Sequence, residues 1–219
     1  MTTNKSALSE SSARYTGAEE LWHSLTHGLG AALSVAALTV LVNLAVKYGD
    51  VWQVVSFAVY GSSLLLLYLA STLYHSVQQP RLKHFFRVCD HAAIYFLIAG
   101  TYTPFLLIGM RGALGWTLLG VVWGLALSGV AFKTVFIGRY ERLATLGYVL
   151  MGWLSVLGFK QLIAAVPLSS MIWLGAGGLV YTFGVIFYAW EKLPYHHVIW
   201  HLFVLGGSAC HFIAVLTLL

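Results

Sequence analysis

Seven apolar runs, each long enough to cross a bilayer, constrain this chain more than any other feature. A helix needs about 20 mainly apolar residues to cross a hydrocarbon core of about 30 Å. Because lipid offers the backbone no hydrogen-bonding partner, such runs must be helical. We therefore predict an all-α, integral membrane bundle of seven transmembrane helices. The predicted spans are 20–46, 51–77, 86–110, 113–132, 143–165, 170–190 and 196–219.

Composition supports the membrane assignment. Hydrophobic residues make up 59% of the chain and charged residues 9%, with a mean hydropathy of +0.82, far from the usual balance of soluble domains. The net charge of +5 does not indicate a nucleic-acid partner, because the basic residues are spread over short loops. Residues 1–18 do not resemble a cleaved leader and are predicted to be a disordered cytoplasmic tail. Residues 19–219 are predicted to form one membrane domain.

The loops predict the direction of the spans. With seven spans, the amino terminus and the second, fourth and sixth loops share one side of the membrane. That side carries nine basic residues and the other carries three. The positive-inside rule therefore predicts a cytoplasmic amino terminus. The nine are Lys5, Arg14, Arg81, Lys83, Arg87, Lys133, Arg139, Arg142 and Lys192, and the three are Lys47, Arg111 and Lys160.

Polar residues gather at one depth in this arrangement. His75 lies near the end of the second span and Asp90 near the start of the third, while His197 and His201 open the seventh. Since a helix rises about 1.5 Å per residue, all four lie near the cytoplasmic face. Ser71 and His75, like His197 and His201, are four residues apart and so share a helix face.

This pattern predicts a metal site. Two imidazoles on one helix face, joined by a third from another helix, can surround one ion, and neutral nitrogen ligands suit zinc. Three protein ligands and a water molecule form the open arrangement of catalytic zinc sites. Asp90 is a natural partner for that water, because a carboxylate in a membrane is costly unless it is paired or hydrated. The alternative is that the histidines are only interfacial anchors.

Four segments carry a family resemblance. "EELWHSLTHGLGA", "STLYHS", "DHAAIYFLIAGTYTPF" and "HHVIWHLFVLGGSACHF" resemble the bacterial hemolysin III family, a branch of the progestin and adipoQ receptor superfamily. The resemblance runs from about Glu19 to the last residue. It implies a seven-helix bundle with Zn²⁺ near the cytoplasmic face, bound by His75, His197 and His201. Asp90 then matches the aspartate that holds the zinc-bound water, and Ser71 matches the motif serine.

The superfamily is similar to alkaline ceramidases, which hydrolyse lipid amides. The resemblance therefore implies a zinc-dependent hydrolase of lipid amides or esters, with a membrane lipid as substrate or ligand, in the bacterial plasma membrane. Two alternatives stay open. One is a non-catalytic sensor or regulator with structural zinc, and the other is a cytolytic, pore-forming hemolysin.

The remaining histidines are ranked lower. Glu20, His23 and His27 share one face of the first span and are candidates for a second shell or a second metal site. Of the two histidines, only His27 matches the family pattern, so it is predicted as the site neighbour. The other predictions are that His84 is solvated in a basic loop, that His91 and His196 are packing residues, and that His211 is too distant to share the ion.

Overall fold

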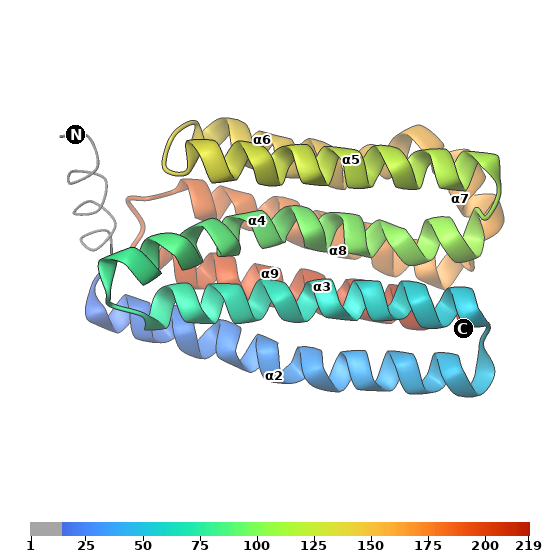
Figure 1. Cartoon of the computed structure of the whole chain (residues 1–219), viewed down its shortest axis with the longest axis horizontal. Coiled ribbons are helices and arrows are strands. Elements are labelled where there is room, and N and C mark those ends of the chain that lie inside the picture. Colours follow the sequence, from blue (N-terminus) through green and yellow to red (C-terminus); the bar gives the residue numbers. More distant parts are fainter. Residues whose placement is uncertain (1–14) are drawn as a thin grey trace.

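The protein is a bundle of seven helices long and apolar enough to cross a membrane, as a computed structural model describing residues 15–219 shows (Figure 1). This confirms the predicted fold class. The residues of the predicted tail up to position 14 lie outside the described part, and the first helix already begins at Gly17. The elements are α2 (Gly17–Tyr48), α3 (Val51–Ser76), α4 (Pro80–Pro104), η1 (Phe105–Gly109), α5 (Ala113–Phe136), α6 (Glu141–Gly152), η2 (Leu154–Gly158), α7 (Phe159–Ala165), α8 (Leu168–Ala189) and α9 (His196–Leu216).

Local signals explain where the helices begin. Thr16 and Glu19 form a capping box at the start of α2, and Asp50 and Gln53 form another at the start of α3. Pro80 opens α4, a position that suits proline because the first helical residues need no amide donor. The third span therefore starts at Pro80, well before the predicted residue 86.

The earlier start of α4 corrects the prediction of a basic loop at this point. His84 lies on the second turn of α4 and is partly buried rather than being in a solvated loop. Lys83, one turn into the helix, is 1% exposed. Both residues therefore belong to the bundle itself.

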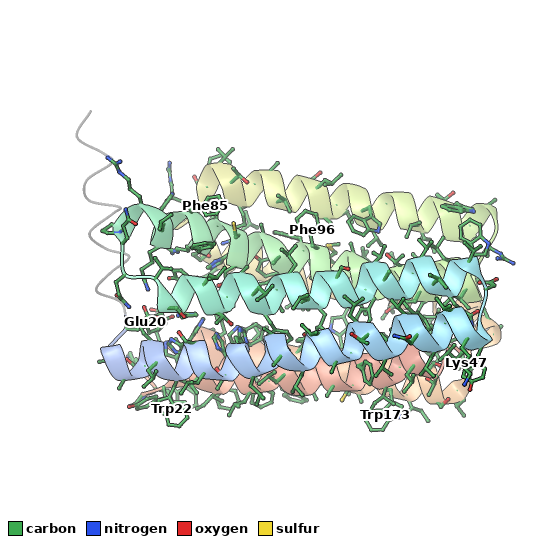
Figure 2. The ribbon with its side chains drawn as sticks, turned by 60° about the horizontal axis from the view of Figure 1, so that its bottom comes forward. Glu20, Trp22, Lys47, Phe85, Phe96 and Trp173 are labelled. Atoms are coloured by element: carbon green, nitrogen blue, oxygen red, sulfur yellow. The ribbon has the colours of Figure 1, made fainter. Side chains whose placement is uncertain are left out.

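The helices are arranged so that α3 and α4 are the most buried spans. The helices from α2 to α6 each pack against the next one along the chain, and α9 returns to lie against α2 as well as α8. The outer faces carry exposed apolar side chains, as expected for contact with lipid. Trp22 and Trp173 are among them and project from the bundle (Figure 2).

Proline perturbs the third span. Pro104 lies inside the helix, and the next five residues form the π-helical segment η1. The hydroxyls of Thr101 and Thr103 donate to the carbonyls of Leu97 and Ala99. These bonds lie next to the point where proline removes a backbone donor.

A tyrosine and serine cluster ties the middle of the bundle together. The Tyr68 hydroxyl donates to Ser208 Oγ at 2.8 Å, and the Tyr181 hydroxyl lies 2.7 Å from the same atom. The Tyr68 ring fits only because Gly30 of α2 has no side chain, since a Cβ there would lie 2.5 Å from a ring carbon. Close packing at small residues of this kind is typical of membrane helices.

We expect Gly30→Ala to lower the stability of the bundle. The added methyl group has no room beside Tyr68, and overpacking of a core costs about 1–3 kcal/mol. Gly124→Ala is the matched control, because nothing lies within 4 Å of a Cβ at this helical position. Thermal unfolding in detergent, followed by tryptophan fluorescence, measures both. If the unfolding temperature of Gly30→Ala is equal to or higher than that of Gly124→Ala, the contact between Gly30 and the Tyr68 ring is not tight.

Candidate metal centre

The candidate site lies at one end of the bundle, where three helix ends meet. The first turns of α2 and α9 and the last turns of α3 bring their side chains together there, and α2 packs against both other helices. Figure 2 shows Glu20 at this end of α2 and Lys47 at the opposite end. The i, i+4 spacing places His197 and His201 on one face of α9, facing His75 of α3.

The three predicted ligands are adjacent and buried. One nitrogen from each of His75, His197 and His201 lies within 4.8 Å of the others. Their ring centres are 4.7 to 5.4 Å apart, and none of the three residues is more than 9% exposed. The structure thus brings together the set that the sequence proposes. Metal ligation by these rings stays a prediction.

Hydrogen bonds orient two of the rings. His75 Nδ1 lies 2.6 Å from Glu20 Oε2, and since a carboxylate only accepts, Nδ1 is the donor. Thr26 Oγ1 donates its proton to the carbonyl of Trp22 and lies 3.1 Å from His201 Nδ1, so this hydroxyl accepts from the ring. Both histidines therefore present Nε2 as the free nitrogen. Metal-binding histidines are commonly held in this way through the second nitrogen.

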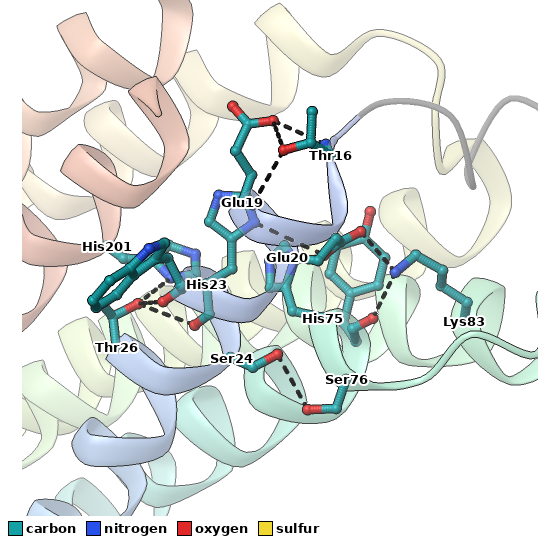
Figure 3. Close-up of polar contacts among 12 residues, drawn as sticks. Thr16, Glu19, Glu20, His23, Ser24, Thr26, His75, Ser76, Lys83 and His201 are labelled. Atoms are coloured by element: carbon teal, nitrogen blue, oxygen red, sulfur yellow. Dashed lines mark hydrogen bonds and ion pairs between the residues drawn. The ribbon is translucent and has the colours of Figure 1, made fainter. Parts of the chain in front are cut away.

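The negative charge of Glu20 is paired with a buried lysine. Lys83 Nζ donates to Glu20 Oε1 at 2.8 Å and to the carbonyl of Tyr74 at 3.2 Å (Figure 3). The chain Lys83, Glu20, His75 thus runs from α4 through α2 to α3. The sequence analysis missed this role of Lys83, because it placed the residue in a loop. A pairing partner is what a carboxylate buried in a membrane needs.

Asp90 and Ser71 lie beside the histidines on the wall of a cavity. The cavity measures about 370 Å³ and is lined mostly by apolar side chains, with Ser71, Asp90, His197 and His201 among its polar lining. Among the described residues, two sets of three side chains have ligand atoms close enough to share one ion, and Asp90 belongs to neither; they are His75, His197 and His201, and Glu20, His23 and His75. The role of Asp90 as the residue that holds a water molecule stays a prediction.

The first helix contributes more than the sequence analysis predicted. His27 stacks on His201 with ring centres 3.4 Å apart and planes 8° from parallel. His23, which was ranked below His27, is fully buried, and its ring centre lies 4.5 Å from that of His75. The i, i+3, i+7 spacing of Glu20, His23 and His27 was the signal that pointed to this shared face.

The other histidines lie outside the cluster. His91 Nδ1 donates to the carbonyl of Arg87 and His196 Nδ1 to that of Phe187. His211 Nε2 donates to the carbonyl of Leu174, on the far part of the cavity wall. Each of these rings has a backbone partner, as packing residues usually do.

The residues present fit a bound metal ion. In the described part of the chain, the buried side-chain nitrogens without a hydrogen-bonding partner all belong to the cluster; they are Nδ1 and Nε2 of His23 and His27, Nε2 of His75, and Nδ1 of His197. Unpartnered buried polar atoms are rare because they cost free energy. A divalent ion is a partner that these nitrogens can share, and zinc, copper, iron and nickel all accept imidazole.

These features define a multi-pass membrane protein with a buried histidine and glutamate cluster able to hold a metal ion. A family model described as haemolysin-III related matches residues 15–212, and the chain belongs to this family.

Two similar bacterial proteins support the assignment. Hemolysin-3 of Bacillus cereus is 52% identical over 198 residues, covering 90% of each chain. A Hemolysin-3 homolog of Bacillus subtilis is 50% identical over 202 residues, covering 92% of this chain and 95% of its own. The human monocyte to macrophage differentiation factor is 30% identical over 172 residues, covering 76% of this chain and 71% of its own. The resemblance drawn from the sequence is confirmed.

We expect Glu20→Gln to weaken metal binding about 10- to 100-fold, the usual effect of losing a carboxylate that holds a ligating histidine. Competition with a zinc chelator measures the Kd. Because Glu20→Gln also leaves Lys83 unpaired, the control is Glu20→Gln/Lys83→Met, which removes the unpaired charge. The double variant should recover stability but not zinc affinity. Full zinc affinity in the double variant would mean that Glu20 serves only to pair Lys83.

Proposed function

We propose that this protein is a zinc-dependent hydrolase of lipid amides or esters in the bacterial plasma membrane. One observation carries the proposal: a carboxylate, a hydroxyl and two of three convergent imidazoles, those of His197 and His201, line a long apolar cavity inside a membrane bundle. His75, His197 and His201 are the residues that would hold the ion. When bound, zinc polarises a carbonyl group and lowers the pKa of a coordinated water molecule.

The cavity suits a lipid chain. Its lining follows the third span from Asp90 to Met110, about 30 Å at the helical rise of 1.5 Å per residue. Apolar residues such as Leu97, Phe105 and Leu162 make up most of this wall. The hydrocarbon part of a substrate packs there and leaves its carbonyl group beside the histidines.

The residues of the chain then have distinct roles in hydrolysis. The reaction consumes one water molecule, breaks the bond from the carbonyl carbon to nitrogen or oxygen, and releases a fatty acid with an amine or alcohol. Asp90 accepts the proton of the attacking water as general base and returns it to the leaving group. Ser71 Oγ is buried close to the Asp90 carboxylate, and donates to the substrate carbonyl oxygen.

The charge distribution supports a cytoplasmic site and amino terminus. Among residues 15–219, the end of the bundle that holds the histidines carries seven of the ten basic residues. Two of these, Lys83 and Lys133, are buried in ion pairs with Glu20 and Glu141 and do not reach headgroups. The five others still exceed the three at the opposite end, which is the bias that the positive-inside rule requires.

A metal-dependent sensor or regulator is the second candidate. A structural zinc site usually has four protein ligands, and the first helix supplies further buried imidazoles beside the three proposed ligands. In this function the ion joins α2, α3 and α9, and no lipid is turned over.

Purified wild-type protein should contain about one zinc ion per chain, and it should release fatty acid from lipid amides or esters. His197→Ala should lose most of the metal and all turnover. Asp90→Asn should keep the metal and lose turnover about 100-fold or more, as expected for a general base. Elemental analysis and fatty-acid release measure the two properties, with His84→Ala as the control outside the cluster. Bound zinc without turnover of either lipid class would exclude the hydrolase and favour the sensor.

A further inference from the structure

His211 has an unused hydrogen-bond acceptor on the wall of the cavity. The residue is 9% exposed and lines the cavity. Its Nε2 lies 3.2 Å from the carbonyl oxygen of Leu174, so Nε2 carries the hydrogen, and Nδ1 of the neutral ring is an acceptor. Within residues 15–219, Nδ1 makes no hydrogen bond, and it is not among the unpartnered nitrogens that are sealed from solvent. This nitrogen is therefore open to the cavity.

The packing of α8 and α9 fixes the orientation of this ring. A Cβ at Gly177 of α8 would lie 2.2 Å from His211 Cδ2 and 2.5 Å from Nε2, so the ring fits only because this residue is a glycine. The edge of the ring that carries Cδ2 and Nε2 thus faces α8. Because Nδ1 is on the opposite edge, it is left for a partner that enters the cavity.

A neighbouring tyrosine has a hydrogen to donate. Tyr181 lines the same cavity, and its ring centre lies 5.3 Å from that of His211. Ser208 Oγ accepts from Tyr68 at 2.8 Å and lies 2.7 Å from the Tyr181 hydroxyl. Since the described residues give Ser208 no other acceptor, its buried hydrogen is satisfied only when Ser208 donates to Tyr181. The hydrogen of the Tyr181 hydroxyl is then free.

The free acceptor and the free donor lie far from the histidine cluster. His211 follows His201 by ten residues on α9, which is about 15 Å along the helix axis. An extended hydrocarbon chain with bonds of about 1.5 Å covers this distance with roughly 12 carbon atoms. Unpaired polar groups in a mostly apolar wall are costly beside a plain hydrocarbon chain. A hydroxyl group satisfies both, because it donates one hydrogen bond and accepts others.

We propose that His211 and Tyr181 form a subsite for a hydroxyl group on the hydrocarbon chain of the lipid, roughly 12 carbon atoms from its carbonyl group. The hydroxyl group donates to His211 Nδ1 and accepts from the Tyr181 hydroxyl. This inference rests on the lipid cavity of the proposed function, but not on hydrolysis. The class of ligand that it predicts is a hydroxylated fatty acyl chain.

Binding of free fatty acids to the full-length protein in lipid nanodiscs tests the proposal. Displacement of a fluorescent fatty acid measures the Kd of stearic acid, 12-hydroxystearic acid and 6-hydroxystearic acid. The two hydroxy acids are isomers that lose the same hydration on binding, so the difference between them reports the position of the hydroxyl group alone.

Two variants remove the polar atoms and keep an aromatic ring; they are His211→Phe and Tyr181→Phe. The matched control is Thr182→Val. Thr182 follows Tyr181 and also lines the cavity, but its hydroxyl already donates to the carbonyl of Gly178 and accepts from Trp153 Nε1. Gel filtration and circular dichroism establish that each variant is folded.

We expect the wild type to bind 12-hydroxystearic acid about 10-fold more tightly than 6-hydroxystearic acid, the effect of one or two added hydrogen bonds. Both variants should reduce this preference to about 2-fold or less, while Thr182→Val keeps it. If the wild type binds both isomers equally, or if the folded variants keep the preference, the subsite is refuted and the lipid cavity stands without it. If none of the three acids displaces the fluorescent fatty acid, the lipid cavity of the proposed function fails, and this inference fails with it.

Discussion

The cost of burying imidazole nitrogens without partners is the constraint on which the rest of this structure depends. The lipid around a membrane bundle supplies no hydrogen-bonding partners, yet five histidine rings meet at one end of this bundle. Only part of their hydrogen-bonding capacity is used. Such a cluster is stable in an apolar core only where its ring nitrogens have partners. One cation can bind several neutral ring nitrogens at once.

Residues around the cluster fix the orientation of the histidine rings. Glu20 accepts from His75 and Thr26 accepts from His201, so that each ring keeps one orientation. Lys83 neutralises Glu20 within the bundle and links α4 to α2 and, through the carbonyl of Tyr74, to α3. The same helices form the wall of the cavity on which Asp90 and Ser71 lie. The same contacts therefore position the histidines and shape the cavity.

The sequence predicts the spans and three of the clustered histidines, because both depend on local periodicity. Twenty apolar residues specify a crossing, and a spacing of four specifies a shared helix face. The sequence does not predict the place of His23, because periodicity shows which residues share a face but not which face of a neighbouring helix it meets. Lys83 was misplaced for another reason. Its charge suggested a loop, whereas Pro80 starts a helix that carries it inward to Glu20.

The central claim is that neutral imidazoles of α3 and α9 bind a divalent ion at the end of this bundle. X-ray absorption at the zinc edge of the purified wild-type protein tests it most directly. We expect a first shell that contains nitrogen at about 2.0–2.1 Å, with the outer scattering pattern of three imidazole rings. A first shell of oxygen or sulfur without imidazole scattering, or protein that takes up no metal, would contradict it.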